Sequence, residues 1–323
     1  MLNVLLRSAV IMPLFVSLLG VGSVSCVAAE AGQSHYWPGS IASVIDRASP
    51  SESLVINVST RRHEGRVSHN GTPVPVGRFL ATDVDIESEM LAVAVNWNPG
   101  REIVEDWMYS AGMKIPYISQ QVTATIGSGN SGVRKSDKDS GAGDILLSPL
   151  MLSYAVNRTW WGDVRFNIYA PTGRYDAESL ANTGTNYWTF EPIVGLVHIE
   201  PAVGREFSLF SGMAVNTRNT DTDYHTGAQF HLASTYVQYA ILLGGFTGIG
   251  VSAYLFRQLS GDSGSGASSG DFKSHGVGLG PVLSYRSRWG GSAIMAELKC
   301  FYSVESTRSP DGNHFSLKFS MTY

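Results

Sequence analysis

The chain has 323 residues, a formal net charge of −4 and only 15% charged residues, against the roughly 25% of typical soluble domains. This weak charge includes no basic patch, so we expect no nucleic-acid partner. Two cysteines exclude an extensive disulfide framework. The 35 glycines and the 11% of aromatic residues suit many short strands joined by turns.

The N-terminus has the pattern of a secretory signal peptide, with Arg7 before a short apolar run and small residues up to Ala29. We expect cleavage after Ala29, so that residues 1–29 are a signal peptide and the protein is exported. Lipoprotein processing at Cys26 is disfavoured, because Ser23 stands where a large aliphatic residue is needed.

The next segment, 30–52, has no strand pattern. Ile41, Val44 and Ile45 are spaced as on one face of a helix, which predicts a short helical element. We treat this segment as separate from the region that follows.

From residue 53 to residue 323, apolar and polar residues alternate in twelve segments, which predicts strands with one apolar and one polar face. The last segment shows this most clearly, since Phe315, Leu317 and Phe319 oppose Ser316 and Lys318. The predicted strands are 53–60, 86–97, 106–118, 143–154, 160–170, 187–198, 205–216, 228–240, 246–258, 275–286, 291–304 and 314–323.

The uncharged stretch 239–256 approaches the length of a membrane helix. Gly244 and Gly245 divide it, however, and predict two strands joined by a hairpin turn.

The connections between the predicted strands alternate between long and short, and the long ones, such as 127–139 and 260–273, are rich in glycine and polar residues. An even strand number with long loops on one rim and short turns on the other is typical of outer-membrane barrels. We therefore predict an all-β fold, a transmembrane antiparallel β-barrel of about 12 strands over 53–323. Both of its termini should lie at the short-turn rim, and the segment 30–52 is placed to plug the lumen.

Aromatic residues gather near the predicted strand ends, as in the girdles that face lipid headgroups, although strands are rich in aromatics in any case. Those near the short turns are Trp97, Trp107, Tyr154, Trp160, Trp161, Tyr285 and Trp289, and those near the long loops are Tyr117, Tyr169 and Trp188.

Several motifs are distinctive, among them GAGDILLSPL at 141–150, APTGRYD at 170–176, NTGTNYWTFEP at 182–192 and GLGP at 278–281. With these motifs the chain resembles the outer-membrane proteins named for the meta-pathway of phenol degradation, which are transporter-like barrels similar to long-chain fatty-acid channels. The resemblance implies uptake of aromatic or other poorly soluble compounds and a location in the outer membrane of a Gram-negative bacterium.

Strand parity places a set of polar side chains in the lumen, where charges of both signs should pair. They could shape a conduction path, or form a salt-bridge network that only fills the barrel. Twelve strands leave a narrow lumen, so we expect an occluded or gated path. The lumen candidates are Lys114, Arg165, Asn167, Glu191, His231, Glu297, Lys299 and Lys318, with Asp163 and Thr189 on the same face.

The long loops contain further candidates. Tyr175, Asn186, Tyr187 and Trp188 could contact a substrate, although loop folding alone would explain them. Elsewhere, an acidic loop with Asn219, Asp221 and Asp223 lacks the fuller ligand set of a calcium loop, and we expect no metal and no cofactor.

A lipid hydrolase is one alternative function, and a structural or adhesive barrel is another. Hydrolysis needs an oriented Ser–His pair, and the stretch His69, Asn70, Gly71 has only part of the phospholipase pattern. No serine partner is suggested by spacing for His225 or His231, so we expect no enzyme.

The function that the sequence favours is a channel for passive uptake of small, poorly soluble organic compounds. Its expected partners are outer-membrane lipid, a small apolar or aromatic solute, and the barrel-assembly machinery, which would bind the C-terminal strand ending in Tyr323.

Overall fold

A computed structural model describes residues 34–67, 74–127, 132–267, 273–307 and 311–323. Other positions, including the predicted signal peptide and the stretch from His69 to Gly71, lie outside the described residues.

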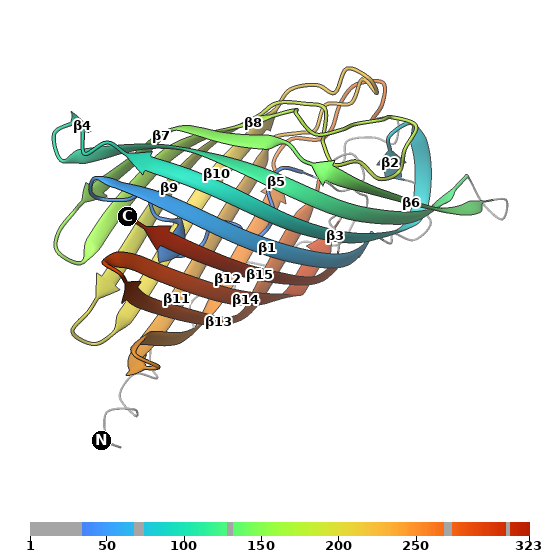
Figure 1. Cartoon of the computed structure of the whole chain (residues 1–323). Helices are drawn as coiled ribbons and strands as arrows, with labels where there is room; N and C mark the ends of the chain where they lie inside the picture. Colours follow the sequence, from blue (N-terminus) through green and yellow to red (C-terminus); the bar gives the residue numbers. More distant parts are fainter. Residues whose placement is uncertain (1–33, 68–73, 128–131, 268–272, 308–310) are drawn as a thin grey trace.

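Twelve antiparallel strands close into a barrel (Figure 1). Each strand pairs with its neighbours in the chain, and β1 closes the ring by pairing with both β3 and β15. The barrel strands are β1 (Ser53–Val67), β3 (Phe79–Asn98), β5 (Trp107–Ile126), β7 (Ile145–Ala155), β8 (Trp160–Ala170), β9 (Thr189–Glu200), β10 (Arg205–Asn216), β11 (Gln229–Leu242), β12 (Gly245–Gln258), β13 (His275–Trp289), β14 (Ser292–Thr307) and β15 (Asp311–Thr322). The predicted number and order of strands are confirmed.

Closure of the barrel also protects the apolar C-terminal strand, because a free edge of such a strand could pair with another chain and aggregate. β15 hydrogen-bonds β14 on one side and β1 on the other, so neither of its edges is free. The backbones of Leu54 and Tyr323 bond to each other, which puts the start of β1 and the end of the chain at one rim. β1 also begins opposite the end of β3, where a short connection follows, so this is the rim of the short turns, as predicted.

Three strands are longer than predicted. β1 continues to Val67, β3 begins at Phe79 and β5 continues to Ile126. Their extensions pair with one another and with β6 (Val133–Ala142), which occupies part of the predicted loop 127–139 (Figure 1). Two very short strands, β2 (Val74–Val76) and β4 (Glu102–Val104), pair with β3 and β5.

The extensions were not predicted because their outer faces are polar and the apolar residues on their inner faces are few. They are joined by exposed ion pairs, such as Arg62 with Glu89 at 2.9 Å and Arg134 with Asp85 at 2.6 Å. Alternation marks a strand most clearly where one face is apolar along its whole length. In these extensions the apolar residues, such as Val84 and Val122, form short inward-facing groups under the connection 171–188.

Burial in the barrel strands is the reverse of that in a soluble protein. On β9, Thr189 and Glu191 are buried, at 1% and 2% exposure, while Val194 is 58% exposed. On β3, Val93 and Val95 are likewise exposed, at 46% and 40%. A continuous apolar outer face of this kind would aggregate in water and is stable in lipid.

The stretch 239–256 folds as the predicted hairpin. Leu243 and Gly244 form its turn with φ of 57° and 73°, as a two-residue type I′ turn requires. None of the helices among the described residues has the length and apolar character needed to cross a membrane.

Two of the predicted girdle aromatics face inward instead. Trp161 and Tyr169 share the inner face of β8 with the buried residues Asp163, Arg165 and Asn167. The prediction was wrong because it used position along the strand and ignored parity. On the outer face, Trp97 and Trp289 are 56% and 71% exposed.

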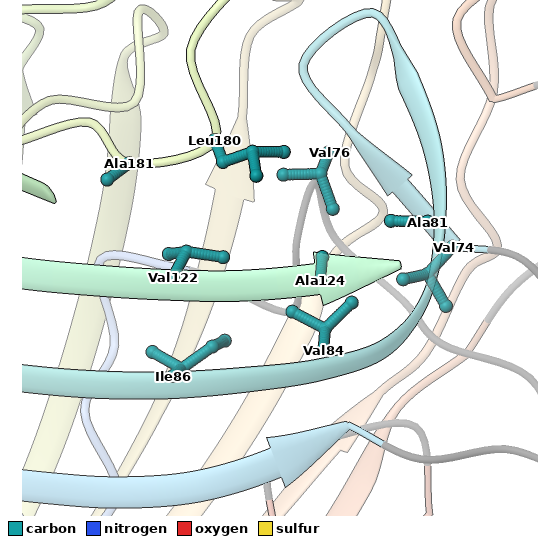
Figure 2. Packing of buried hydrophobic residues seen from close by; sticks show 9 residues of the cluster. All are labelled: Val74, Val76, Ala81, Val84, Ile86, Val122, Ala124, Leu180 and Ala181. Atoms are coloured by element: carbon teal, nitrogen blue, oxygen red, sulfur yellow. The ribbon is translucent and has the colours of Figure 1, made fainter. Parts of the chain in front are cut away.

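The long-loop rim has a small hydrophobic cluster of its own (Figure 2). Leu180 and Ala181, from the connection 171–188, pack against Ile86 and Val84 of β3 and Val122 of β5. The connection is also tied to the sheet by hydrogen bonds, such as that from the Leu180 N–H to Asp137, at 3.1 Å. It is therefore fixed against the extended strands.

Candidate functional site

The N-terminal segment, from residue 34 to residue 49, hydrogen-bonds side chains on the inner faces of the barrel strands. The Ala48 N–H donates to Asp163 at 2.7 Å, and the Arg165 guanidinium donates to the Asp46 carbonyl at 2.7 Å. Its only helical element is a single 3-10 turn, Val44–Asp46, where a short helix was predicted.

Strands further round the barrel from β8 hold the same segment. Ser208 of β10 donates to the Ala42 carbonyl at 2.9 Å, and Lys299 of β14 donates to Ser43 at 3.0 Å. Lys318 of β15 donates to the Ser40 carbonyl at 2.8 Å. Ala42 is completely buried, so the segment fills part of the barrel interior.

The predicted lumen residues lie on the inner faces of their strands, and most of their charges are paired. Arg165 contacts Asp163 at 2.6 Å, and Lys299 contacts Glu297 at 3.0 Å. Glu191 accepts hydrogen bonds from Asn167 at 2.8 Å and from the His231 ring at 2.9 Å.

Other polar groups of this network were not among the candidates. Asp46 pairs with Lys318, and Glu206 pairs with Arg286. Glu206 also accepts hydrogen bonds from Tyr239 at 2.9 Å and from the Val44 N–H at 3.2 Å. Alternation on β10 could have placed Glu206 in the lumen, since it shares a face with Ser208. No pattern marked Asp46, because it lies in the N-terminal segment.

Three cavities follow one another between the N-terminal segment and the barrel wall. The outer cavity measures about 140 Å³ and includes Asp144 and Thr185 near the long loops. The middle cavity measures about 130 Å³ and includes Glu191 and Ala94. The inner cavity, of about 20 Å³, reaches Asn98, the last residue of β3, at the short-turn rim.

Adjacent cavities share lining residues, so they form a series. The outer and middle cavities meet at Ser40, Arg61, Lys114 and Tyr169. The middle and inner cavities share Asp46, among others. The series runs along β1, β3 and β5, where the segment leaves space.

His35 and Asp144 link the segment to the long loops, with the imidazole Nε2 2.9 Å from the carboxylate. Burial raises the pKa of Asp144, but hydrogen bonds from His35 and from the N–H groups of Gly173 and Thr185 outweigh it. They hold this pKa below its ordinary value of 3.8. The ionised Asp144 carboxylate therefore binds both the N-terminal segment and the connection 171–188.

The four loop candidates do not all face the interior. Tyr187 is 3% exposed, with its ring 5.3 Å from that of His35. Asn186, at φ 59°, donates to the Asn219 side chain at 2.8 Å. Trp188 is 44% exposed on the outer parity of β9, and Tyr175 is half-buried.

The acidic loop is held together by its own contacts. Asp223 pairs with Arg218 at 2.5 Å and accepts a hydrogen bond from the Ser265 hydroxyl at 2.7 Å. Within the described ranges, no three His, Cys, Asp or Glu residues are grouped as a metal site requires.

His225 has a serine neighbour that spacing did not reveal. Its Nδ1 lies 3.2 Å from the Ser263 hydroxyl, across the loops 217–228 and 259–274. Its Nε2 faces the Asn216 carbonyl at 3.0 Å, so the ring lacks the orienting carboxylate of a catalytic triad.

The closed barrel, apolar outer face and polar interior define an outer-membrane channel fold. Residues 66–319 match the family described as "Putative MetA-pathway of phenol degradation", and the chain belongs to this family. No curated protein sequence matches the chain significantly.

One solved structure among those compared has the same fold. The COG4313 outer membrane channel from Pseudomonas putida F1 is similar with a TM-score of 0.64 at 15% identity, over 86% of this chain and 97% of that one. The transport unit of the autotransporter AIDA-I from Escherichia coli gives 0.46 at 9% identity, over 84% and 90% of the two chains. A Pseudomonas aeruginosa FadL homologue gives 0.37 at 10% identity, over 84% and 89%. The last two TM-scores are below 0.5, so we infer nothing from these two structures. The chain therefore shares its barrel fold with an outer membrane channel.

Proposed function

We propose that the protein is a channel for passive uptake of small, poorly soluble organic compounds, aromatic or hydrocarbon. The observation that carries this proposal is the series of three cavities between the N-terminal segment and β1, β3 and β5. The two larger cavities measure about 140 and 130 Å³. A protein cavity of about 150 Å³ accommodates benzene, so this volume suits a single ring. The family description, which refers to phenol degradation, supports the same solute class.

In this proposal the N-terminal segment is a plug that leaves the path narrow. The inner cavity, of about 20 Å³, is too small for a ring, so passage requires the segment to shift near the short-turn rim. Its hydrogen bonds with the strands would set how often this occurs. Transport would need no energy source, because the solute moves down its concentration gradient.

The protein would act in the outer membrane of a Gram-negative bacterium. Export would use the predicted signal peptide 1–29, and the barrel-assembly machinery would bind the C-terminal strand ending in Tyr323. The exposed apolar residues of the strands would then contact lipid. An apolar solute crosses a polysaccharide-coated leaflet poorly, so a protein path has a physical use.

The test is uptake by vesicles with a lipopolysaccharide outer leaflet, with and without the refolded protein. Phenol and toluene should enter the protein-containing vesicles faster, and a sugar of similar size should not. Equal entry of all three would indicate a general pore. Entry of none, with a barrel that runs as folded on a heat-modifiability gel, would favour the structural or adhesive alternative.

A further inference from the structure

Two cations, Arg61 and Lys114, lie at the junction of the outer and middle cavities. Arg61 is 8% exposed and donates to the Ser40 carbonyl at 3.2 Å. In the part of the chain that the structure describes, neither Arg61 nor Lys114 has a carboxylate oxygen within 4.0 Å, whereas Arg165, Lys299 and Lys318 each have one. An enclosed cation without a direct partner is costly, so an anion bound beside it is favoured.

The acidic groups that also line the middle cavity are occupied by other donors. Asp46 accepts from Lys318 and from the Ala42 N–H at 2.9 Å. Glu191 accepts from Asn167 and lies against the His231 ring. The carboxylates of Asp46 and Glu191 therefore attract Arg61 and Lys114 only across the cavity. Donor groups of both cations remain available to a ligand at the junction.

The outer cavity beside these cations is walled by flat rings. His63 of β1 stacks on His314 of β15, with ring centroids 4.1 Å apart and planes 11° apart. Trp37 of the N-terminal segment meets His63 edge-on at 6.4 Å. Tyr169 and Phe256 line the same cavity. Ring faces and edges of this kind bind an aromatic ring by stacked or T-shaped contacts.

We propose that the outer cavity binds a small aromatic carboxylate, with its ring among these aromatic side chains and its carboxylate held by Arg61 and Lys114. This inference rests on the proposed function and adds a charged group, the carboxylate, to the aromatic solutes proposed there. The planar guanidinium can donate two parallel hydrogen bonds to a carboxylate, and Lys114 adds a point charge. The cavity of about 140 Å³ limits the ligand to one ring.

Three probes separate the two parts of the site. Benzoate has both the ring and the charge, benzyl alcohol has the ring without the charge, and acetate has the charge without the ring. Affinities would be measured by calorimetry on the refolded full barrel. We expect benzoate to bind at least about tenfold more tightly than either other probe, as for a charged hydrogen bond in a shielded site.

Variants then locate the carboxylate. Arg61→Gln and Lys114→Gln should each weaken benzoate binding by about tenfold and leave benzyl alcohol unchanged. Arg61→Lys, which keeps the charge and loses the planar fork, should retain an intermediate affinity. Lys135→Gln is the matched control, since Lys135 of β6 lies over the Phe79 ring, away from the cavities. Heat-modifiable mobility confirms that each variant is folded.

Equal binding of benzoate and benzyl alcohol, or unchanged benzoate affinity in both glutamine variants, would overturn the inference. Acetate binding as tight as that of benzoate would overturn its aromatic part. Vesicle uptake separates this failure from failure of the proposed function. If phenol still enters faster than sugar while benzoate is not preferred, only the inference fails. If phenol enters no faster than sugar, the proposed function fails, and the affinities still decide whether the cavity binds carboxylates.

Discussion

Asp46 is the residue whose loss should most weaken the hold of the barrel on its N-terminal segment. Its carboxylate accepts hydrogen bonds from the Ala42 and Ser43 N–H groups, at 2.9 and 3.2 Å, and from the Lys318 ammonium. The side chains of Asp46 and Lys318 are 13% and 9% exposed, so water screens this ion pair little. We therefore choose Asp46→Ala as the perturbation.

The expected cost follows from what the substitution leaves behind. Removing one partner of a buried ion pair typically costs about 3–5 kcal/mol, because the other charge stays buried without it. We take the lower end, since Lys318 keeps its bond to the Ser40 carbonyl at 2.8 Å. About 3 kcal/mol corresponds to a rise on the order of 10²-fold in the ratio of undocked to docked segment.

Single-channel recording in planar bilayers measures this change directly. Asp46→Ala should open more often, or to a larger conductance, than the wild type. The double variant Asp46→Ala with Lys318→Met removes both charges and should recover part of the wild-type behaviour. Asp221→Ala, on an exposed loop, is the control. If conductance and thermal stability of Asp46→Ala both equal those of the wild type, Asp46 does not hold the N-terminal segment in place.

Three further predictions concern the long-loop rim. Leu180→Ala removes a side chain that is 1% exposed and should cost about 2–5 kcal/mol of loop docking, so trypsin should cleave at Arg174 sooner; unchanged cleavage would contradict this. Gly184→Ala should loosen the same loop, since a Cβ there would lie 2.6 Å from the Gly173 backbone, and an unchanged melting temperature would count against it. The depressed pKa of Asp144 means that its stabilisation is present above its ordinary pKa of 3.8 and is lost as pH falls through the lower folded value. In the wild type, acid should therefore make the connection 171–188 more sensitive to protease. In Asp144→Asn the connection should already be sensitive at neutral pH and should not change with acid. Identical pH profiles of cleavage in the two proteins would disprove the role of Asp144.

Most of the barrel could be predicted from sequence because the membrane imposes a strict two-residue period on its strands. The hairpin at Leu243 and Gly244 was found for the same reason, with glycine marking the turn. The extensions of β1, β3 and β5 were missed because no lipid contact imposes an apolar outer face on them, and the apolar residues that β3 and β5 bury there, such as Val84 and Val122, face inward.

The residues of the candidate site were harder to predict from the sequence than the barrel strands. Parity placed Glu191 and Lys299 on the inner faces of their strands, but it says nothing of the N-terminal segment, whose Asp46 and Ser43 meet other strands across the barrel. Of the two cations at the cavity junction, only one could be predicted from the sequence. Lys114 was a candidate, whereas Arg61 lies just beyond the predicted first strand and was left in a loop.

In the proposed function, solute passes through the cavities beside the N-terminal segment. Neighbouring residues of β3 test it, since Ala94 lines the middle cavity and Val93 is 46% exposed on the outer face. Phenol entry into lipopolysaccharide-coated vesicles would be measured for Ala94→Trp and Val93→Trp, once both variants show heat-modifiable mobility. We expect Ala94→Trp to reduce phenol entry to that of protein-free vesicles and Val93→Trp to match the wild type. Equal entry through both variants and the wild type would contradict it.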